Sequence, residues 1–166
     1  MSQQVTTITR EVAFIPIEDI EQNPWNPNVM EEEKRLELKK LMAKSNPRQF
    51  FSRDPLWASP SDIFYGKKLK KGAVHAKYVF IDGYHRWLNA KELGWTEVGI
   101  DIESITESDA RQQCYSKNFL RGQTDPVKEA KLFKAEVSEG KTQEQIAEKY
   151  FKDPGYISSS LTLLKL

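Results

Sequence analysis

The pattern of apolar residues changes once along this chain, and that change limits the folds open to it. In the first half, short apolar runs of the kind that form buried strands recur at VAFIPI (12–17), LWAS (56–59), YVFID (78–82) and EVGIDIES (97–104). From Asp109 onward the patterns are helical only. The sequence therefore predicts a strand-rich half followed by an all-helical half, with a boundary near residue 108.

One segment of the first half has the spacing of an amphipathic helix. Residues 31–45 carry Leu38, Leu41 and Met42 at positions expected to share one face. The stretch just before them, 23–28, is rich in proline and asparagine, which excludes helix there.

Two further stretches interrupt the expected helices and strands. NPRQFFSRDP (46–55) is expected to break the preceding helix. GKKLKKGAVHAK (66–77) is expected to form a hairpin tip or loop. Its lysines can meet nucleic acid, but a solvated loop is the favoured interpretation.

Composition excludes several classes of protein. The 166 residues have a net charge of +1, so any contact with nucleic acid must come from a local patch. Cys114 is the single cysteine, which excludes an intrachain disulfide and a cysteine-built zinc site. The polar start MSQQVTTITREV lacks the apolar core of a signal peptide, and no apolar run is long enough to span a bilayer. These features predict a cytoplasmic protein with no membrane contact.

The segment IDGYHRWLNAKELGW (81–95) has the order strand, glycine, helix, which is typical of phosphate-binding turns. Gly83 allows the backbone to approach an anion. Arg86 can donate two hydrogen bonds to a phosphate, and His85 can donate one more. The competing interpretation makes Arg86 a surface residue and His85 a capping residue. Three side chains of this helix are expected to face the core: Tyr84, Trp87 and Leu88.

The second half begins with clear helix-capping signals. Asp125 precedes Pro126, a suitable first helical residue, and Gly140 is placed to end that helix. Thr142 and Gln145 have the spacing of a capping box for the next helix. The apolar face of the first of these helices is expected to consist of Val127, Ala130, Phe133 and Val137.

Two short helices, TQEQIAEKY (142–150) and DPGYISSSLTLLKL (153–166), are separated by a tight turn and have helix-turn-helix size. Their shared core is expected to contain Ile146, Tyr150, Ile157 and Leu161, with the small Ala147 where the helices cross. In a helix-turn-helix the start of the second helix enters the major groove. That surface here would be Gly155, Tyr156, Ser158, Ser159 and Thr162, with phosphate contacts from Lys141, Lys149 and Lys152. A plain helical hairpin is the alternative interpretation.

Taken together, IDGYHRWLNAKELGW and the stretch from KNFLRGQTDPVKEA to YISSSLTLLKL resemble the ParB family of chromosome and plasmid partition proteins. The first segment resembles that family's phosphate motif. The second resembles its motif of asparagine and arginine leading into a helix-turn-helix. IPIEDIEQNPWNPN is similar to the strand and proline-rich stretch that open the domain. The resemblance covers most of the chain.

The resemblance implies an α+β ParB/sulfiredoxin-like domain with a small mixed sheet over residues 1–108, binding CTP or another nucleoside triphosphate with Mg2+. It implies an all-α helix-turn-helix domain over 109–166, which would be cut short after the recognition helix. It also implies a nucleotide pocket between the two halves, and nucleotide binding there would regulate DNA clamping. It also implies a homodimeric full-length protein, a ParA-type ATPase partner, a centromere-like site on double-stranded DNA, and a location at the nucleoid.

The family's functional positions fall on named residues of this sequence. The nucleotide-binding set is Gly83, Tyr84, His85, Arg86, Asn118 and Arg121, with Asn118 also in the metal position. The DNA-binding set is Thr142, Gln143, Lys152, Tyr156, Ser158, Ser159 and Thr162.

Some positions depart from the family pattern, and other activities share the fold. Tyr84 and Lys117 stand where the family has acids, and His85 stands where it has an arginine, which weakens the case for tight magnesium binding and for efficient hydrolysis. Tyr84 also replaces the catalytic cysteine of sulfiredoxins, which excludes that reaction. The free-serine kinases of this superfamily carry a motif similar to DGYHRW. Such a kinase would need a carboxylate base, for which Asp19 and Glu21 are the nearest candidates. A ParB-like nuclease and a slow CTPase stay open.

Overall fold

The computed structural model describes residues 11–25, 31–69, 74–120, 122 and 125–165. The chain divides into two compact units. The sheet unit consists of Met1–Asn23 with Pro27–Ser104, and the helical unit consists of Pro24–Asn26 with Ile105–Leu166.

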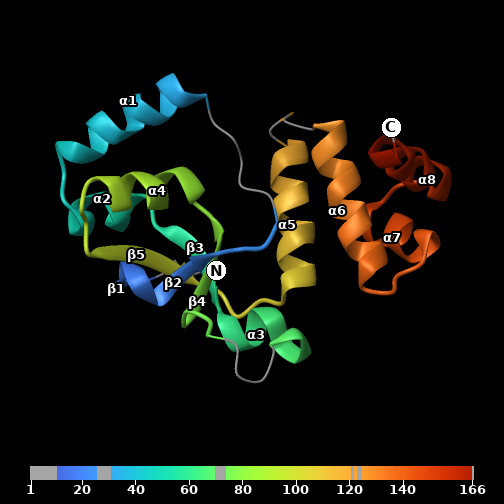
Figure 1. Cartoon of the computed structure of the whole chain (residues 1–166), viewed down its shortest axis with the longest axis horizontal. Helices are drawn as coiled ribbons and strands as arrows, with labels where there is room; N and C mark the ends of the chain where they lie inside the picture. The colour runs from blue at the N-terminus through green and yellow to red at the C-terminus, as the bar shows by residue number, and fades with distance from the viewer. Residues whose placement is uncertain (1–10, 26–30, 70–73, 121, 123–124, 166) are drawn as a thin grey trace, which may run out of the picture. The chain divides into compact units, whose positions relative to one another are not determined.

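The sheet unit is built on five strands that form one mixed sheet. These strands are β1 (Ala13–Pro16), β2 (Ile20–Gln22), β3 (Leu56–Pro60), β4 (Tyr78–Asp82) and β5 (Glu97–Ile102). Their order across the sheet is β1-β5-β3-β4-β2. The β1–β5 and β3–β4 pairs are antiparallel, whereas β3–β5 and β2–β4 are parallel (Figure 1). The α+β class with a small mixed sheet is therefore confirmed.

The three central strands come from the most apolar runs of the sequence. β3, β4 and β5 each hold at least three consecutive buried residues, as expected for strands covered on both faces. Leu56, Phe80 and Ile100 are all 1% exposed or less and lie in one core cluster. Burial on both faces explains why these segments are continuously apolar and do not alternate with polar residues.

Four α-helices complete the described part of this unit: α1 (Glu32–Ala43), α2 (Pro47–Arg53), α3 (Ser61–Tyr65) and α4 (Tyr84–Glu92). Two 3-10 turns lie at Ile17–Asp19 and Gly66–Lys68. α1 packs along α4, and α2 packs against β5 (Figure 1).

One expectation for this region is confirmed and one is wrong. Helix α1 ends at Ala43, before the stretch 46–55, as predicted; a new helix, α2, then begins there, because Asn46 accepts a hydrogen bond from the Gln49 amide and Pro47 opens α2. The expectation that Leu41 lies on the buried face of α1 is wrong. Leu41 is 63% exposed, while Met42 is fully buried. The buried stripe of α1 runs through Leu38 and Met42, which are four residues apart, and Leu41 lies about 100° from Met42 around the axis.

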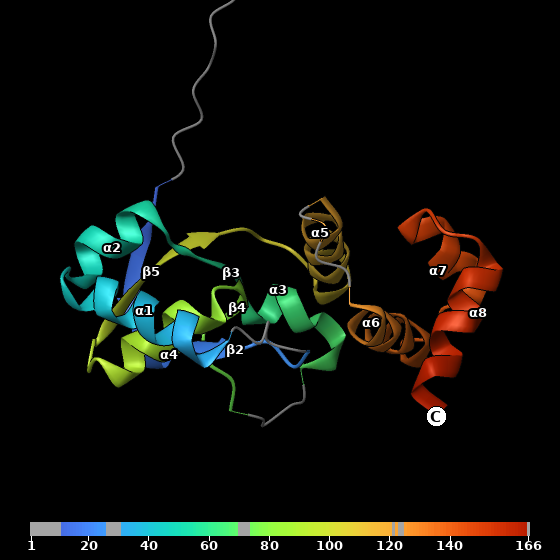
Figure 2. The same ribbon diagram turned by 90° about the horizontal axis from the view of Figure 1, so that it is seen from above.

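The helical unit consists of α5 (Glu107–Leu120), α6 (Pro126–Ser138), α7 (Gln143–Tyr150) and α8 (Pro154–Thr162), followed by a 3-10 turn at Leu163–Lys165. α8 packs against both α6 and α7 (Figure 2). The buried core consists of Phe133, Ile146, Ala147, Tyr150 and Ile157, with Tyr115, Leu132 and Leu161 packed at its edge. The predicted shared core of the two short helices is confirmed.

The predicted caps are present, but one face of α6 differs from expectation. Thr142 and Gln145 form the capping box, and Gly140 has a φ of 89° just after the end of α6. Val127 and Val137 are 49% and 42% exposed, so the expected four-residue apolar face is wrong at those two positions. The buried positions beside Ala130 and Phe133 are instead the acidic Glu129 and Glu136.

Candidate anion and nucleic-acid sites

The turn from β4 into α4 requires a glycine for two independent reasons. Gly83 has a φ of 117° and a ψ of 22°, a left-handed conformation that side chains destabilise. A Cβ atom at this position would also lie 2.4 Å from Cδ2 of Leu56. The conformation and the lack of space together keep this turn free of any side chain.

The first turn of α4 has the donor geometry of an anion site. The first helical hydrogen bond runs from the Trp87 amide to the Gly83 carbonyl at 2.9 Å, so the amides of residues 84–86 have no helical acceptor. No side chain of the described residues caps this helix. Amides that have no acceptor within the helix favour a negative group at a helix start. This geometry is what the sequence motif predicts.

Arg86 has a structural role that the sequence does not indicate. Its Nη1 donates to the carbonyl oxygens of Asp54 at 2.8 Å and Pro55 at 2.7 Å, which ties the loop between α2 and β3 to α4. Its Nη2 lies 3.3 Å from the point that a Cβ of Gly83 would occupy. A phosphate contact would therefore use the side of the guanidinium that faces Gly83, while Nη1 holds the loop.

The aromatic residues of α4 pack against the core of the sheet unit. Trp87 is half-buried, with its ring 5.1 Å from the Phe80 ring and 6.0 Å from the Tyr84 ring. The Lys91 ammonium covers the Trp87 ring at 4.2 Å. The expected core contact of Trp87 is confirmed, although the residue is half-buried and not fully enclosed, and Leu88 is likewise half-buried.

The second half of the expected nucleotide set lies in the other unit. Asn118 belongs to α5, but its side chain lies outside what the structure describes, and so does Arg121. Within the described residues, no three or more histidine, cysteine, aspartate or glutamate side chains gather as a metal site. Whether these two residues join Gly83 and Arg86 stays a prediction, and so does the metal.

The two carboxylates considered for a kinase reaction form ion pairs at the β2 edge of the sheet. Asp19 pairs with Lys77 at 3.3 Å. Glu21 pairs with Nδ1 of His75 at 3.0 Å and accepts a hydrogen bond from the Tyr65 hydroxyl at 3.4 Å. Both carboxylates therefore anchor the segment that leads into β4.

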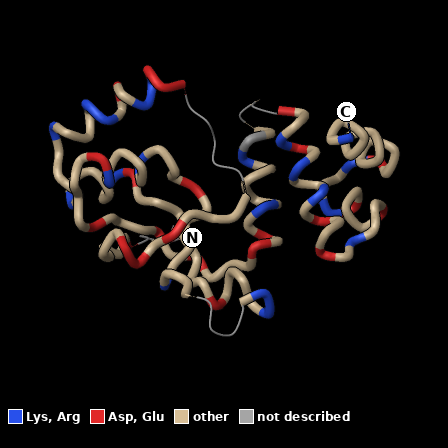
Figure 3. The backbone as a smooth tube through the Cα atoms, viewed as in Figure 1, with Lys and Arg blue, Asp and Glu red and all other residues tan. Residues whose placement is uncertain are grey.

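The pair α7–α8 presents a small, uncharged surface at the position where a helix-turn-helix contacts DNA. Gly155, Ser158, Ser159 and Thr162 are exposed along α8, and Gln143 is exposed at the start of α7. α8 contains no charged residue, so its tube is tan in Figure 3. The Thr142 hydroxyl oxygen accepts from the Gln145 amide and therefore serves as a cap.

Other expected DNA contacts are already engaged within the helical unit. The Tyr156 hydroxyl donates to Glu129 at 2.9 Å. The Lys152 ammonium lies 5.0 Å from the centres of both the Phe119 and the Tyr156 rings. The hydroxyl of Tyr156 and the charge of Lys152 thus face α5 and α6 as well as solvent, which the sequence does not indicate.

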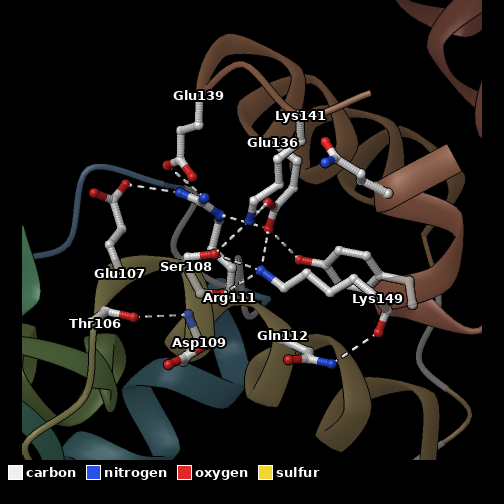
Figure 4. A network of polar contacts seen from close by, with 12 residues as sticks. Thr106, Glu107, Ser108, Asp109, Arg111, Gln112, Glu136, Glu139, Lys141 and Lys149 are labelled. Atoms are coloured by element: carbon white, nitrogen blue, oxygen red, sulfur yellow. Dashed lines mark hydrogen bonds and ion pairs between the residues drawn. The ribbon is translucent and has the colours of Figure 1, made fainter. Parts of the chain in front are cut away.

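Lys141 and Lys149 belong to a buried polar network (Figure 4). The carboxylate of Glu136, with 0% of its side chain exposed, accepts hydrogen bonds from the Lys149 ammonium at 2.8 Å, from the Tyr150 hydroxyl at 2.7 Å and from the Lys141 ammonium. Both ammonium groups also donate to the Ser108 hydroxyl. A contact from either lysine to a DNA phosphate would require it to leave this network.

Arg111 completes the network from α5. Its side chain is 1% exposed and pairs with Glu107 at 3.0 Å, Glu139 at 2.6 Å and Glu136 at 3.5 Å. Burial acts to raise the pKa of Glu136, but the hydrogen bonds from Lys141, Lys149 and Tyr150 outweigh it and lower that pKa to about 2. The network joins α5, α6 and α7, so it holds the helix pair α7–α8 in place through charged side chains.

Comparisons with known proteins give a consistent set of relatives, although no protein-family model matches the chain. A nucleoid occlusion protein of Geobacillus kaustophilus is 24% identical over 157 residues, covering 94% of this chain and 50% of the relative. The chromosome-partitioning protein ParB of Myxococcus xanthus is 29% identical over 127 residues, covering 74% and 43%. A probable ParB of Neisseria meningitidis is 35% identical over 92 residues, covering 55% and 32%.

The chain spans about half the length of the first two of these relatives, and less of the third. Among solved structures, a C-terminally truncated ParB from Caulobacter crescentus complexed with CTP-gamma-S aligns with 94% of this chain and 79% of its own, at a TM-score of 0.49 and 20% identity. At these scores the structural likeness supports no conclusion about this chain beyond the likeness itself.

Proposed function

We propose that this chain, which is similar to ParB and nucleoid occlusion proteins, binds double-stranded DNA in chromosome or plasmid partition or in nucleoid occlusion. The observation that supports DNA binding is the pair α7–α8. Each helix has a side-chain cap at its start, the two share one buried core, and the exposed side of α8 carries Ser158, Ser159 and Thr162. Small hydroxyl groups on an uncharged helix can approach base edges closely.

DNA binding is tested by fluorescence anisotropy with mixed-sequence duplex at low and moderate salt. Each phosphate contact steepens the dependence of affinity on salt by roughly one unit. With no arginine on α8, we expect weak, salt-sensitive binding by this chain, roughly micromolar or weaker at physiological salt. Tighter, selective binding is expected when a dimer pairs two half-sites.

The decisive variant is Ser159→Glu, which places a carboxylate on the exposed face of α8. We expect it to abolish binding because the new charge faces the phosphates. The matched control is Ser138→Glu, since Ser138 is also exposed but lies on α6. If the parent binds no duplex at low salt, or if both variants bind as the parent does, the helical unit does not recognise DNA.

We propose that the turn at Gly83 binds the phosphates of a nucleotide, with CTP as the first candidate because of the family resemblance. The helix start of α4 at the left-handed Gly83 and the adjacent guanidinium of Arg86 support this assignment. Asn118 and Arg121 are the proposed partners from the helical unit, with Tyr84 and His85 beside Gly83. Hydrolysis, if it occurs, is expected to be slow, because Tyr84 and Lys117 replace acidic residues of the family.

Calorimetry with CTP, ATP, GTP and UTP, with and without Mg2+, tests this site. Arg86→Gln removes the charge but keeps an amide that can donate to the carbonyl oxygens of Asp54 and Pro55. We expect this variant to weaken binding of the preferred nucleotide by about 1.5 to 3 kcal/mol, or ten- to hundred-fold in affinity. Lys91→Gln, on the same helix but at its other end, is the control. Unchanged affinity in Arg86→Gln would remove Arg86 from the site.

The described residues gather no acidic cluster that would hold the proposed magnesium ion without a nucleotide. Mg2+ commonly binds through substrate phosphates and water, so the calorimetry without Mg2+ shows whether it contributes. No helix in the described part of the chain is long and apolar enough to cross a membrane. Homodimerisation, a ParA-type ATPase partner, a centromere-like DNA site and a place at the nucleoid are proposals for the whole protein.

The alternative proposal is an enzyme of the same superfamily, such as a free amino-acid kinase or a nuclease. The observation that favours it is the sequence DGYHRW at a turn suited to phosphate. The ion pairs of Asp19 and Glu21 argue against either residue as a ready base. Adding free serine to the nucleotide panel and measuring product distinguishes the two: turnover without DNA binding would favour the kinase.

A further inference from the structure

The turn between α7 and α8 contains a residue that the local backbone does not favour. Phe151 has a φ of 56° and a ψ of 44°, and it is the one non-glycine residue with positive φ in the described part of the chain. Its amide donates to the Glu148 carbonyl at 3.4 Å, and the Lys152 amide donates to the Ala147 carbonyl at 2.8 Å. These two bonds form a Schellman ending of α7, in which glycine is the usual left-handed residue.

Phe151 gains no burial that would offset this strain. The residue is 91% exposed, whereas Tyr150 just before it is 4% exposed. Among the described residues, Phe151 takes part in neither of the core clusters. A left-handed side chain that remains in water destabilises the unit that carries it. The packing of the described residues therefore gives no reason for a large ring at this position.

The residues that follow Phe151 hold the turn in an ordered conformation. The Lys152 ammonium lies 5.0 Å from the centres of the Phe119 and Tyr156 rings, and the Asp153 carboxylate accepts from the Gly155 amide as the cap of α8. The ring of Phe151 therefore projects from an ordered turn immediately before the first residues of α8. In a helix-turn-helix, those residues are the ones that approach base edges.

We propose that Phe151 is a specificity-determining residue that contacts a thymine methyl group in the major groove. This inference rests on the proposed DNA-binding function and names what the site recognises. The uncharged helix α8 offers hydroxyl groups at Ser158 and Ser159 but lacks an arginine for guanine. Apolar contact between phenylalanine and the C5 methyl of thymine is an established form of base recognition. Phe151 supplies the apolar part of the site, and the serines supply its hydrogen bonds.

The experiment uses the full 166-residue chain and a duplex of about two helical turns, enriched by the parent protein from random sequence at low salt. Its partner duplex has the same sequence with every thymidine replaced by deoxyuridine, which removes only the methyl groups. We expect the parent to bind the uridine duplex about five- to thirtyfold more weakly, since a single base-pair contact is worth about this much.

Two variants, Phe151→Gly and Phe151→Asn, remove the ring and tolerate the left-handed backbone. Each is expected to bind the thymidine duplex as weakly as the parent binds the uridine duplex, and to show no preference between the two. Phe151→Gly is also expected to melt about 2 to 4 °C higher than the parent, because the strain is relieved. Weaker binding by a more stable protein cannot be attributed to unfolding. Val137→Ala, which trims an exposed apolar residue on α6, is the control.

The outcomes separate this inference from the proposed function. If the parent binds DNA but does not distinguish thymidine from deoxyuridine, or if both Phe151 variants bind and discriminate as it does, the thymine assignment is overturned while DNA binding stands. The exposed ring would then point to a protein partner. If the parent enriches no sequence and binds no duplex at low salt, the proposed function itself fails, and the thymine assignment fails with it.

Discussion

Replacing Glu136 by glutamine should destabilise the helical unit more than any surface substitution. This carboxylate lies at the centre of the network in Figure 4, where it accepts from Lys141, Lys149 and Tyr150 and pairs with Arg111. Glutamine has nearly the same shape, so the substitution removes the negative charge without creating a cavity. The cations of Arg111, Lys141 and Lys149 would then have only the carboxylates of Glu107 and Glu139 near them in this network. An uncompensated buried charge is costly.

The magnitude follows from the pKa of the carboxylate. Its value falls from the ordinary 4.5 to about 2 in the folded unit, which corresponds to about 3 kcal/mol of stability near neutral pH. Because the folded pKa is the lower one, this stability is present above pH 4.5 and is lost as the pH falls from 4.5 towards 2. We therefore expect Glu136→Gln to reduce the free energy of unfolding by about 3 kcal/mol at pH 7.

The assay is urea denaturation followed by far-ultraviolet circular dichroism, which reports directly on helix, at pH 7 and at pH 3. The parent should lose stability between the two pH values, whereas the variant should lose about 2 kcal/mol less, because it no longer has this carboxylate to protonate. Glu144→Gln, an exposed carboxylate on α7, is the matched control and should change little. A variant that unfolds like the parent at pH 7, or that retains the full loss at pH 3, would refute the assigned role of Glu136.

Two further predictions concern the sheet unit. Gly83→Ala should reduce the free energy of unfolding by about 2 to 3 kcal/mol, because the new methyl group meets Leu56 and the φ of 117° is strained. Gly94→Ala, with a φ of 73° but open space around it, is the control and should cost only about 1 kcal/mol. Equal losses of stability in thermal melts would show that the contact with Leu56 is unimportant. Trp87→Ala should cost about 2 to 3 kcal/mol, since the ring packs on Phe80 but is only half-buried; a melting curve that does not move would show that this ring adds nothing to the core.

The sequence by itself determined the elements whose causes lie within a few residues of one another. The apolar runs at β3, β4 and β5, the capping box of Thr142 and Gln145, and the glycine turn at Gly83 all depend on neighbours one to five positions away. Local rules of propensity and capping apply at that range. The same rules contain the signal for α2, because Asn46 followed by Pro47 is a helix start as well as a break after α1.

Only the tertiary structure decided which charged side chains are partners and which are exposed. Arg86 donates to carbonyl oxygens more than 30 positions earlier, and Arg111 meets Glu136 across two helices. From the sequence alone, Arg86 is expected to bind a phosphate or to lie at the surface, nothing distinguishes Arg111, and Lys141 and Lys149 are expected to contact phosphates. A buried charge is stable only where opposite charges and donors converge on it from several elements, and that convergence exists only after the helices have packed.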